Sequence, residues 1–327
     1  MRKKLLRTAG FVRKDGFEMA DGKTVLVIAG PTASGKTALS VEASLKFGGE
    51  VVSADSMQIY REMDIGTAKP SAVEQRGIPH HLMGIVSPDQ PFSVADWQSA
   101  AKCVVTEVLS RGALPVVTGG TGLYVNSLVH NLVFSEAVAN PAYRRKLKDM
   151  ADAEGVEAVH SLLADCDPES AATIHPNNLV RVIRALEVYH ETGEPMAVHR
   201  MRSRMEPSPW RFILIGLLPE RQLLYSRINR RADEMMSAGL PDEVHRLLES
   251  GYPGTLQSMQ GIGYQELVAH LRGSCSLEAA VEQIRQNTRN YAKRQITWFS
   301  RLEGLQWVDP VQTGTDRILE RIEQALA

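Results

Sequence analysis

The most informative segment of this sequence is GPTASGKT, made up of Gly30, Pro31, Thr32, Ala33, Ser34, Gly35, Lys36 and Thr37. It matches G-x-x-x-x-G-K-[ST], the pattern of a phosphate-binding loop or P-loop. An apolar run at 24–29 precedes it and suits a buried parallel strand, and residues 38–45 after it have apolar side chains at helical spacing. A chance glycine turn before a helix is the alternative, but the strand–loop–helix context favours the P-loop.

The residue types of this loop predict a site for a diphosphate or triphosphate. Glycines let the backbone approach a phosphate closely, and the following helix N-terminus adds a favourable dipole. Lys36 would neutralise phosphate charge, and the hydroxyl of Thr37 would be a ligand of Mg²⁺. Magnesium is therefore the cofactor that we expect.

The rest of the chain predicts an α/β fold with a P-loop NTPase-like parallel sheet flanked by helices and an inserted helical domain. Strand and helix signals alternate from 23 to 135, with strands at 50–53 and 114–118 and a helix at 93–110. Strand signals are absent from 140–205 and return at 211–218 and 305–308, and helices are expected at about 220–238, 241–249 and 277–299. We therefore assign 21–139 and 206–327 to the core, 140–205 to the insertion, and 1–20 to a disordered leader.

Composition excludes several classes of protein. The 327 residues are 43% hydrophobic and 23% charged with a net charge of −1, so no global basic field indicates nucleic acid. No apolar run reaches the ~18–20 residues of a membrane span, and the basic N-terminus lacks the apolar stretch of a secretory signal. Three widely spaced cysteines without a C-x-x-C motif predict reduced thiols, hence a cytoplasmic protein.

The position of the carboxylates favours a transferase over a motor or a GTPase. Strand 114–118 ends in Thr118-Gly119-Gly120, without the Asp that would supply a second contact to magnesium. Strand 50–53 is instead followed by Asp55, which should emerge beside the P-loop where substrates dock. Asp55 is thus a candidate substrate-binding acid, and the alternative is that it only caps the next turn.

Six motifs taken together resemble the tRNA dimethylallyltransferases, also called tRNA isopentenyltransferases or the IPP transferase family. The motifs are GPTASGKT, SADSMQIYREMDIGTAKP (53–70), GGTGLY (119–124), HPNN (175–178), GIGYQE (261–266) and AKRQITWF (292–299). The resemblance extends from about Thr24 to Val308 and is closest to the bacterial form. The zinc-finger tail of the eukaryotic relatives has no counterpart in this sequence.

The resemblance implies transfer of a prenyl group from dimethylallyl diphosphate to N6 of an adenosine beside the tRNA anticodon. By this resemblance the P-loop, with Gly35, Lys36 and Thr37, holds the diphosphate and its magnesium, and Asp55 is the general base. Thr121 would lie near the reacting groups, although a helix N-cap is an equally good interpretation. Arg227 would bind the diphosphate, whereas Arg230 and Arg231 would be solvated or face tRNA. The partners expected are tRNA and dimethylallyl diphosphate, with no obligate protein partner and a monomeric enzyme.

The tRNA-binding surface is predicted from basic side chains together with the resemblance. Arg285, Arg289 and Lys293 are spaced as a stripe on one helix, with few acids nearby. The alternative is that they form an ordinary solvated helix face. The target base must leave its stack to reach Asp55, so base flipping is expected. The residues assigned to tRNA are Asp55, Ser56, Met57, Gln58, Arg144, Arg181, Arg184, Gly263, Tyr264, Lys293, Arg294 and Gln295.

Two other features are interpreted as structural. His80-His81 has no acidic or cysteine partner at metal-ligand spacing, and adjacent strand residues point to opposite sides. The scattered methionines are interpreted as core filler. Two rival functions remain open at this stage: a P-loop kinase whose Asp55 binds the acceptor hydroxyl, and a nucleotide-regulated RNA-binding protein.

Overall fold

A computed structural model describes residues 23–134, 140–202 and 206–327 of this chain. Its contacts divide the described chain into two compact units, 23–126 with 209–327, and an inserted unit within 127–208. The sequence had placed these boundaries at 140 and 205. The leader predicted at 1–20 lies outside the described residues.

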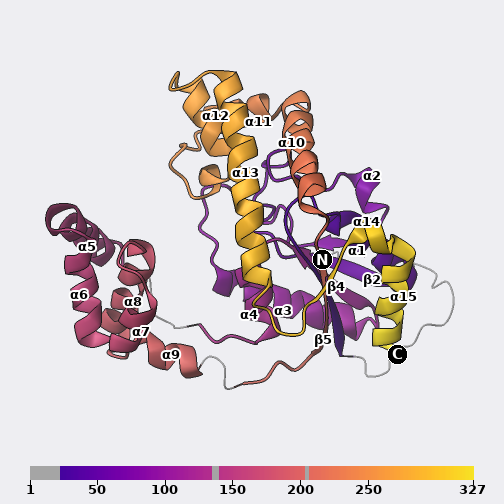
Figure 1. Cartoon of the computed structure of the whole chain (residues 1–327), viewed down its shortest axis with the longest axis horizontal. Helices are drawn as coiled ribbons and strands as arrows, with labels where there is room; N and C mark the ends of the chain where they lie inside the picture. The colour runs from indigo at the N-terminus through magenta and orange to yellow at the C-terminus, as the bar shows by residue number, and fades with distance from the viewer. Residues whose placement is uncertain (1–22, 135–139, 203–205) are drawn as a thin grey trace, which may run out of the picture. The chain divides into compact units, whose positions relative to one another are not determined.

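The larger unit is built on one sheet of six parallel strands (Figure 1). The strand order is β3-β2-β4-β1-β5-β6, and β1 lies between β4 and β5, with Leu26 opposite Val116 and Ile213. The strands are β1 (Thr24–Ala29), β2 (Gly49–Ser53), β3 (His80–His81), β4 (Leu114–Gly119), β5 (Arg211–Leu217) and β6 (Gln306–Val308). The P-loop follows β1, so it lies at the carboxyl edge near the middle of the sheet, where open parallel sheets bind ligands.

Helices cover both faces of this sheet. On one face, α1 (Lys36–Phe47) and α15 (Thr315–Leu326) bury apolar side chains against β1, β4, β5 and β6 in one continuous cluster. On the other, α3 (Val94–Ser110) packs against β2 and β4, and its buried Trp97 donates from Nε1 to the carbonyl of Ser53 at 2.9 Å. Because β1 is buried on both sides, its sequence is continuously apolar, as the sequence analysis assumed.

A group of C-terminal helices completes the larger unit. Helix α10 follows β5 and packs on α13, which also contacts α12 (Figure 1). These helices are α10 (Arg221–Ser237), α11 (Leu240–Glu249), α12 (Tyr264–Leu271) and α13 (Leu277–Phe299). The predicted helices at 220–238, 241–249 and 277–299 agree with α10, α11 and α13, whereas α12, α15 and the short edge strand β3 were not predicted. The remaining short elements are α2 (Ala72–Gln75), α4 (Gly122–Val129), α14 (Pro310–Thr313) and a 3₁₀ turn at Ser258–Gln260.

The inserted unit is helical, as the sequence indicated. Its helices are α5 (Pro141–Glu154), α6 (Val156–Cys166), α7 (Pro168–Thr173), α8 (Leu179–Thr192) and α9 (Met196–Arg202), which share a core of Leu147, Val159, Leu163 and Leu186. The side chain of Glu187 is fully buried in this unit. Its carboxylate accepts hydrogen bonds from Arg144 and Arg184 and from the backbone N–H of Asn140. Although burial acts to raise it, these donors lower the pKa of Glu187 to about 2.

No helix in the described ranges is both long enough and apolar enough to span a membrane.

Candidate functional site

A cavity of about 420 Å³ in the larger unit collects most of the residues predicted from the P-loop and from Asp55. Its walls come from segments far apart in the sequence: the P-loop, residues 55–58 and 66–68, the end of β4, and helices α10 and α13. Thr32, Lys36, Thr37 and Asp55 all line it. The parallel sheet brings these segments together because every strand delivers its carboxyl end to the same edge.

Lys36 opens α1 and its ammonium lies among buried groups. Its Nζ donates to the carbonyl of Pro31 at 2.6 Å, within the loop itself. Burial lowers the pKa of Lys36 to about 7; the charge of Asp55 opposes this shift, and that of Arg231 adds to it. A bound anion would stabilise the charged ammonium, which burial disfavours. Lys36 is therefore suited to bind phosphate.

Asp55 follows β2 and faces the cavity while holding the turn that comes after it. Its Oδ1 accepts from the backbone N–H of Met57 at 2.9 Å and from that of Gln58 at 3.4 Å. Both hydrogen bonds go to the same oxygen, so this turn does not use Oδ2. The two interpretations of Asp55, a turn cap and a substrate-binding acid, are therefore compatible.

Gln295 of α13 joins the P-loop to the turn after β4. Its Oε1 accepts from the N–H of Thr32 at 2.8 Å, and its Nε2 donates to the carbonyl of Gly120 at 2.9 Å. The side chain reaches this position because residue 120 is glycine: a Cβ there would lie 2.1 Å from Nε2 of Gln295. A Cβ at Gly122 would likewise lie 2.0 Å from Trp298, which explains the glycines of the GGTGLY motif. The tRNA contact assigned to Gln295 stays a prediction, and this 4% exposed side chain has a structural task of its own.

Thr121 and Tyr291 support the Asp55 side of the cavity. Oγ1 of Thr121 accepts from the N–H of Ser56 at 3.0 Å and donates to its Oγ at 3.2 Å, so it fixes the residue next to Asp55. Tyr291 of α13 lines the cavity, and burial, with the charge of Asp55 adding to it, raises its pKa to about 12. The guanidinium of Arg294 lies over the Tyr291 ring, 5.6 Å from its centroid. The sequence analysis did not identify Tyr291, because one aromatic side chain on an amphipathic helix resembles core.

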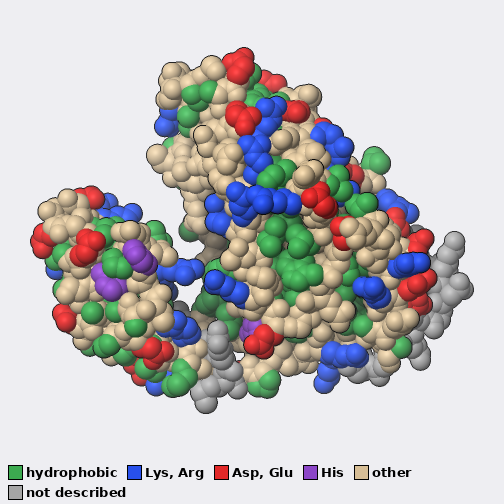
Figure 2. All heavy atoms as spheres, in the orientation of Figure 1, with side chains coloured by type: hydrophobic (Ala, Val, Ile, Leu, Met, Phe, Trp, Pro, Cys, Tyr) green, Lys and Arg blue, Asp and Glu red, His purple; other side chains and the backbone are tan. Residues whose placement is uncertain are grey.

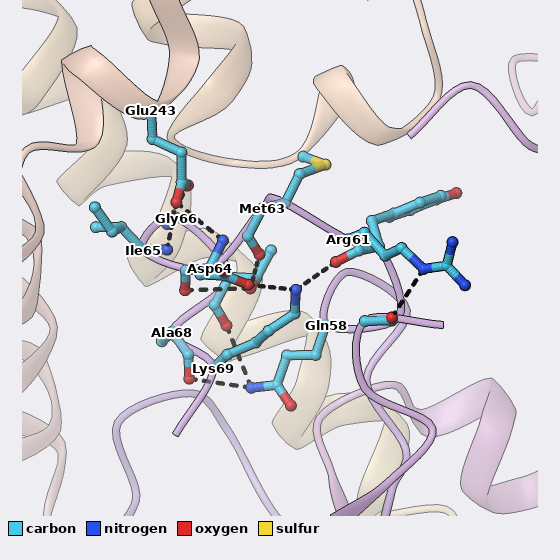
Figure 3. A network of polar contacts seen from close by, with 12 residues as sticks. Gln58, Arg61, Met63, Asp64, Ile65, Gly66, Ala68, Lys69 and Glu243 are labelled. Atoms are coloured by element: carbon cyan, nitrogen blue, oxygen red, sulfur yellow. Dashed lines mark hydrogen bonds and ion pairs between the residues drawn. The ribbon is translucent and has the colours of Figure 1, made fainter. Parts of the chain in front are cut away.

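The segment from Gln58 to Lys69 forms a closed loop that holds one wall of the cavity (Figure 3). Nε2 of Gln58 donates to the carbonyls of Thr67 and Ala68, and its Oε1 accepts from Ser53. The ammonium of Lys69 binds the carbonyl of Tyr60 and the carboxylate of Asp64. Gln58 was assigned to tRNA, and both ends of its amide already have partners, Nε2 within this loop and Oε1 at Ser53 of β2.

Glu243 of α11 anchors the same loop from outside (Figure 3). Its carboxylate accepts from three successive backbone N–H groups, those of Asp64, Ile65 and Gly66, at 2.8–3.2 Å. A fourth hydrogen bond, 2.6 Å long, comes from the hydroxyl of Tyr264. Glu243 is 3% exposed and was not identified from sequence, where it is one acid on an ordinary amphipathic helix.

The predicted tRNA contacts of Gly263 and Tyr264 stay predictions, and both residues are buried in this structure. Tyr264 is 1% exposed, and its ring packs against Gly66, where a Cβ would lie 2.5 Å from it. Gly263 is buried with φ of 99°, and its N–H donates to Glu266 at the start of α12. The GIGYQE motif thus builds a helix start and the anchor of the 58–69 loop.

The arginines of α10 lie along the P-loop, and Arg231 lines the main cavity as well as a second one that Arg227 and Arg230 share. Arg231 lines the main cavity and lies 3.5 Å from the Thr32 hydroxyl, so its assignment to a solvated or tRNA-facing surface is wrong. Burial lowers the pKa of Arg231, as expected for a cation enclosed near Lys36. Arg227 lines a second cavity, with Ser34 and Gly35 on the outer flank of the loop. A diphosphate contact by Arg227 stays a prediction.

The basic stripe on α13 is partly neutralised. Arg285 pairs with Asp233 and Glu282, and Arg289 pairs with Glu282 at 3.0 Å, so acids from α10 and from the stripe's own helix meet these two arginines. The assumption of few nearby acids was therefore wrong for this half of the stripe. Lys293 and Arg294 are exposed, and the only polar side-chain partner of Lys293 in the described residues is Asn290, at 3.4 Å. Figure 2 shows Lys and Arg side chains gathered over the region of α13.

In the inserted unit, two of the three arginines assigned to tRNA carry paired charge. Arg144 and Arg184 both bind Glu187, at distances of 2.5–2.8 Å. Arg181 is exposed and forms no ion pair within the described part of the chain. Of the three, Arg181 keeps the charge most available to a phosphate.

Several methionines form part of the cavity and not only of the core. Met57, Met83 and Met235 line it together with Ile228 and Ile284. These flexible apolar side chains suit a surface that accommodates a small hydrocarbon group. The interpretation of the methionines as core filler is wrong for these three.

The residues at the P-loop fit a magnesium ion that arrives with its ligand. Within the described ranges, no group of three or more His, Cys, Asp or Glu side chains could hold a metal. Thr37 begins the first turn of α1 and lines the cavity beside Lys36. Magnesium bound here would depend on the Thr37 hydroxyl, phosphate oxygens and water, a ligand set that this ion commonly takes.

Comparison with known sequences matches most of this chain to one family. The family model described as IPP transferase matches residues 58–302. A tRNA dimethylallyltransferase of Acetivibrio thermocellus is 48% identical over 304 residues, which cover 93% of this chain and 97% of the relative. One from Geobacter metallireducens is 49% identical over 288 residues, covering 88% and 93%.

Solved structures of similar proteins confirm the predicted fold class. The full-length tRNA isopentenylpyrophosphate transferase from Bacillus halodurans matches with a TM-score of 0.70 and 44% identity, covering 93% of this chain and 95% of that one. A eukaryotic dimethylallyltransferase acting on tRNA matches with a TM-score of 0.78 and 28% identity, covering 92% and 77%. With the family model, these matches extend over nearly the whole sequence, and this chain belongs to the IPP transferase family.

Proposed function

We propose that this chain transfers a dimethylallyl group from dimethylallyl diphosphate to N6 of the adenosine beside the anticodon of tRNA. One observation carries the proposal: a single cavity combines a P-loop and two half-buried basic side chains, Lys36 and Arg231, with one carboxylate, Asp55. The cations suit a diphosphate leaving group, and the carboxylate suits an acceptor that must lose a proton. The names of the relatives, tRNA dimethylallyltransferases, support the same reaction.

The proposed reaction exchanges one bond for another at C1 of the prenyl group. The N6–C1 bond forms as the C1–O bond breaks, and the diphosphate leaves with the electron pair of that bond. Asp55 accepts the proton that N6 must lose, and its Oδ2, which the 55–58 turn leaves unused, is the oxygen suited to this role. Thr121 and Tyr291 belong to this side of the site, because Thr121 fixes Ser56 and Tyr291 lines the same cavity as Asp55.

The leaving group develops negative charge, which preorganised donors and cations stabilise. The P-loop N–H groups, Lys36 and Arg231 would supply this stabilisation. Magnesium bound at Thr37 would neutralise part of the diphosphate charge as a Lewis acid. The apolar lining from Met57, Met83 and Met235 suits the hydrocarbon part of the donor and keeps water away from it.

For tRNA, the exposed cations Lys293, Arg294 and Arg181 are the best candidates for phosphate contacts. Phosphate contacts by Lys and Arg dominate nucleic-acid affinity and make it dependent on salt. The kinase alternative is less well supported, since a kinase needs neither the C-terminal helices nor the family motifs that they carry.

The assignment of Asp55 is tested by mass spectrometry of tRNA incubated with the protein, Mg²⁺ and dimethylallyl diphosphate. Wild-type protein should add one C5 unit to the tRNA. Asp55→Asn should lower the rate by ~10²–10⁴-fold, because the amide cannot accept the proton. Asp55→Ala should lose the same activity and, in addition, about 1 kcal/mol of stability, because only alanine lacks an acceptor for the N–H groups of Met57 and Gln58.

A near-normal rate for Asp55→Asn would contradict the general-base role. If the wild type added no C5 unit but transferred phosphate from ATP, the proposed function itself would fail in favour of the kinase.

The low pKa of Lys36 predicts that diphosphate binding takes up a proton. In the free protein this pKa is about 7, so at about pH 8 the ammonium is mostly deprotonated. A bound anion raises the pKa again, so the wild type should take up about 0.9 protons more than Lys36→Arg, which stays charged. The affinity of the wild type should correspondingly fall as the pH rises above about 7. Calorimetry in buffers of different ionisation enthalpy measures this number, and equal uptake by the two proteins would disprove it.

The exposed half of the α13 stripe should contribute to tRNA affinity, and the paired half should not. Lys293→Ala is expected to make the plot of log affinity against log salt shallower by about one unit, the effect of losing one phosphate contact. Arg285→Ala, on the same helix but paired with Asp233 and Glu282, is the matched control and should leave the slope unchanged. Equal slopes for all three proteins would mean that α13 presents only a solvated face.

A further inference from the structure

His80 and His81 form the two-residue edge strand β3, and their side chains have different surroundings. Nε2 of His81 lies 2.6 Å from the carboxylate of Glu50, which also binds Arg111. His80, by contrast, lines the main cavity. The structural interpretation of the pair therefore suits His81 and leaves the role of His80 to be explained.

The His80 ring presents an acceptor that has no partner. Its Nδ1 lies 2.8 Å from the carbonyl of Ile78, and because a carbonyl only accepts, Nδ1 must carry the proton. Nε2 of the neutral ring then has a free lone pair. This atom is buried and forms no hydrogen bond within the described residues. Burial also lowers the pKa of His80, which keeps the ring neutral. Buried polar atoms in native proteins nearly always have a hydrogen-bond partner, so we expect Nε2 to accept a hydrogen bond from a bound molecule.

The position of His80 narrows the choice of that partner. His80 also lines an adjoining cavity, which shares Thr37, Met83, Arg231 and Met235 with the main one but does not include Asp55. His80 thus shares with Thr37 and Arg231 a cavity that Asp55 does not line. An ionised diphosphate offers only acceptors, and a dimethylallyl chain offers no polar atom. The side-chain donors that share these cavities with His80, such as those of Thr37, Lys69 and Arg231, form no hydrogen bond with its Nε2 in the described residues. That leaves water as the donor, and the water molecules held most firmly at this site are those that magnesium retains when it binds a diphosphate.

We infer that Nε2 of His80 accepts a hydrogen bond from a water ligand of the magnesium ion held at Thr37 with the diphosphate. This inference rests on the proposed function, and it makes His80 a positioning residue that acts through the water. Hydrogen-bond partners of metal ligands typically change metal affinity by ~10–100-fold. The Nδ1 bond to Ile78 fixes the ring, so the acceptor is oriented before the ligand arrives.

The test is calorimetric binding of inorganic diphosphate, with excess Mg²⁺ and with EDTA. The ratio of the two affinities reports the gain due to magnesium. His80→Leu, which lacks the acceptor, should lose ~10-fold or more of this gain while affinity in EDTA stays at the wild-type value. His80→Gln, whose amide oxygen can replace Nε2, should recover most of it. His81→Leu is the matched control on the same strand; it loses the contact with Glu50 and should keep the full magnesium gain.

Three outcomes would overturn the inference. An unchanged magnesium gain in His80→Leu would mean that no metal-bound water uses this nitrogen. An equal loss with and without magnesium would show that His80 only supports the fold of the phosphate site. If the wild type itself gained nothing from magnesium, the magnesium part of the proposed function would fail and this inference with it, whereas the first two outcomes leave that function intact.

Discussion

A buried carboxylate surrounded by neutral donors holds the site together. Glu243 forms no ion pair in the described part of the chain, and its two oxygens accept from three consecutive backbone N–H groups and from the hydroxyl of Tyr264. A charge can be buried in this way only if it is fully hydrogen-bonded, and bonds to a charged acceptor are about twice as strong as neutral ones. Burial and the charge of Glu243 together raise the pKa of Tyr264, which keeps its proton on the shared bond. Helices α11 and α12 are thereby tied to the loop that carries residues 64–66.

A buried polar side chain that is fully hydrogen-bonded also holds the wall of the cavity formed by α13. There the side chain is the amide of Gln295. Gln295 binds Thr32 of the P-loop and Gly120 of the turn after β4, and so fixes α13 to two loops at the carboxyl edge of the sheet. The side chains that bind substrates are therefore positioned by residues that are themselves buried and engaged. The phosphate-binding side comes from a loop and α10, and the carboxylate side from β2 and α13. Asp55 and Lys36 line one cavity in this structure.

The features that could be predicted from the sequence were those set by short motifs or by regular hydrophobic patterns. The P-loop, the strand before it and the position of Asp55 after β2 follow from short motifs and from the geometry of parallel sheets, and the structure agrees with them. Arg231 was harder, because Arg227 and Arg231 lie one helical turn apart and only the packing of α10 decides which one enters the main cavity.

Contacts between residues far apart in the chain could not be predicted from the sequence. Glu243 binds residues about 180 positions earlier in the chain, and Asp233 meets Arg285 from another helix, so neither signal exists in the sequence around these residues. Tyr264 shows the converse: it belongs to one of the motifs that suggested the family, and in this structure its hydroxyl binds the anchoring carboxylate of Glu243. A family motif therefore marked an important position without identifying its role.

The anchoring role of Glu243 is tested most directly by amide hydrogen exchange over residues 57–70 in Glu243→Gln. Loss of the charge-assisted bonds, at about 2–3 kcal/mol, should speed exchange of the 64–66 amides by on the order of 10²-fold. Tyr264→Phe removes one donor of four and should have a much smaller effect on the same amides. If Glu243→Gln exchanged at the wild-type rate, the loop would be stable without its anchor, and the account of how this cavity is held would be contradicted.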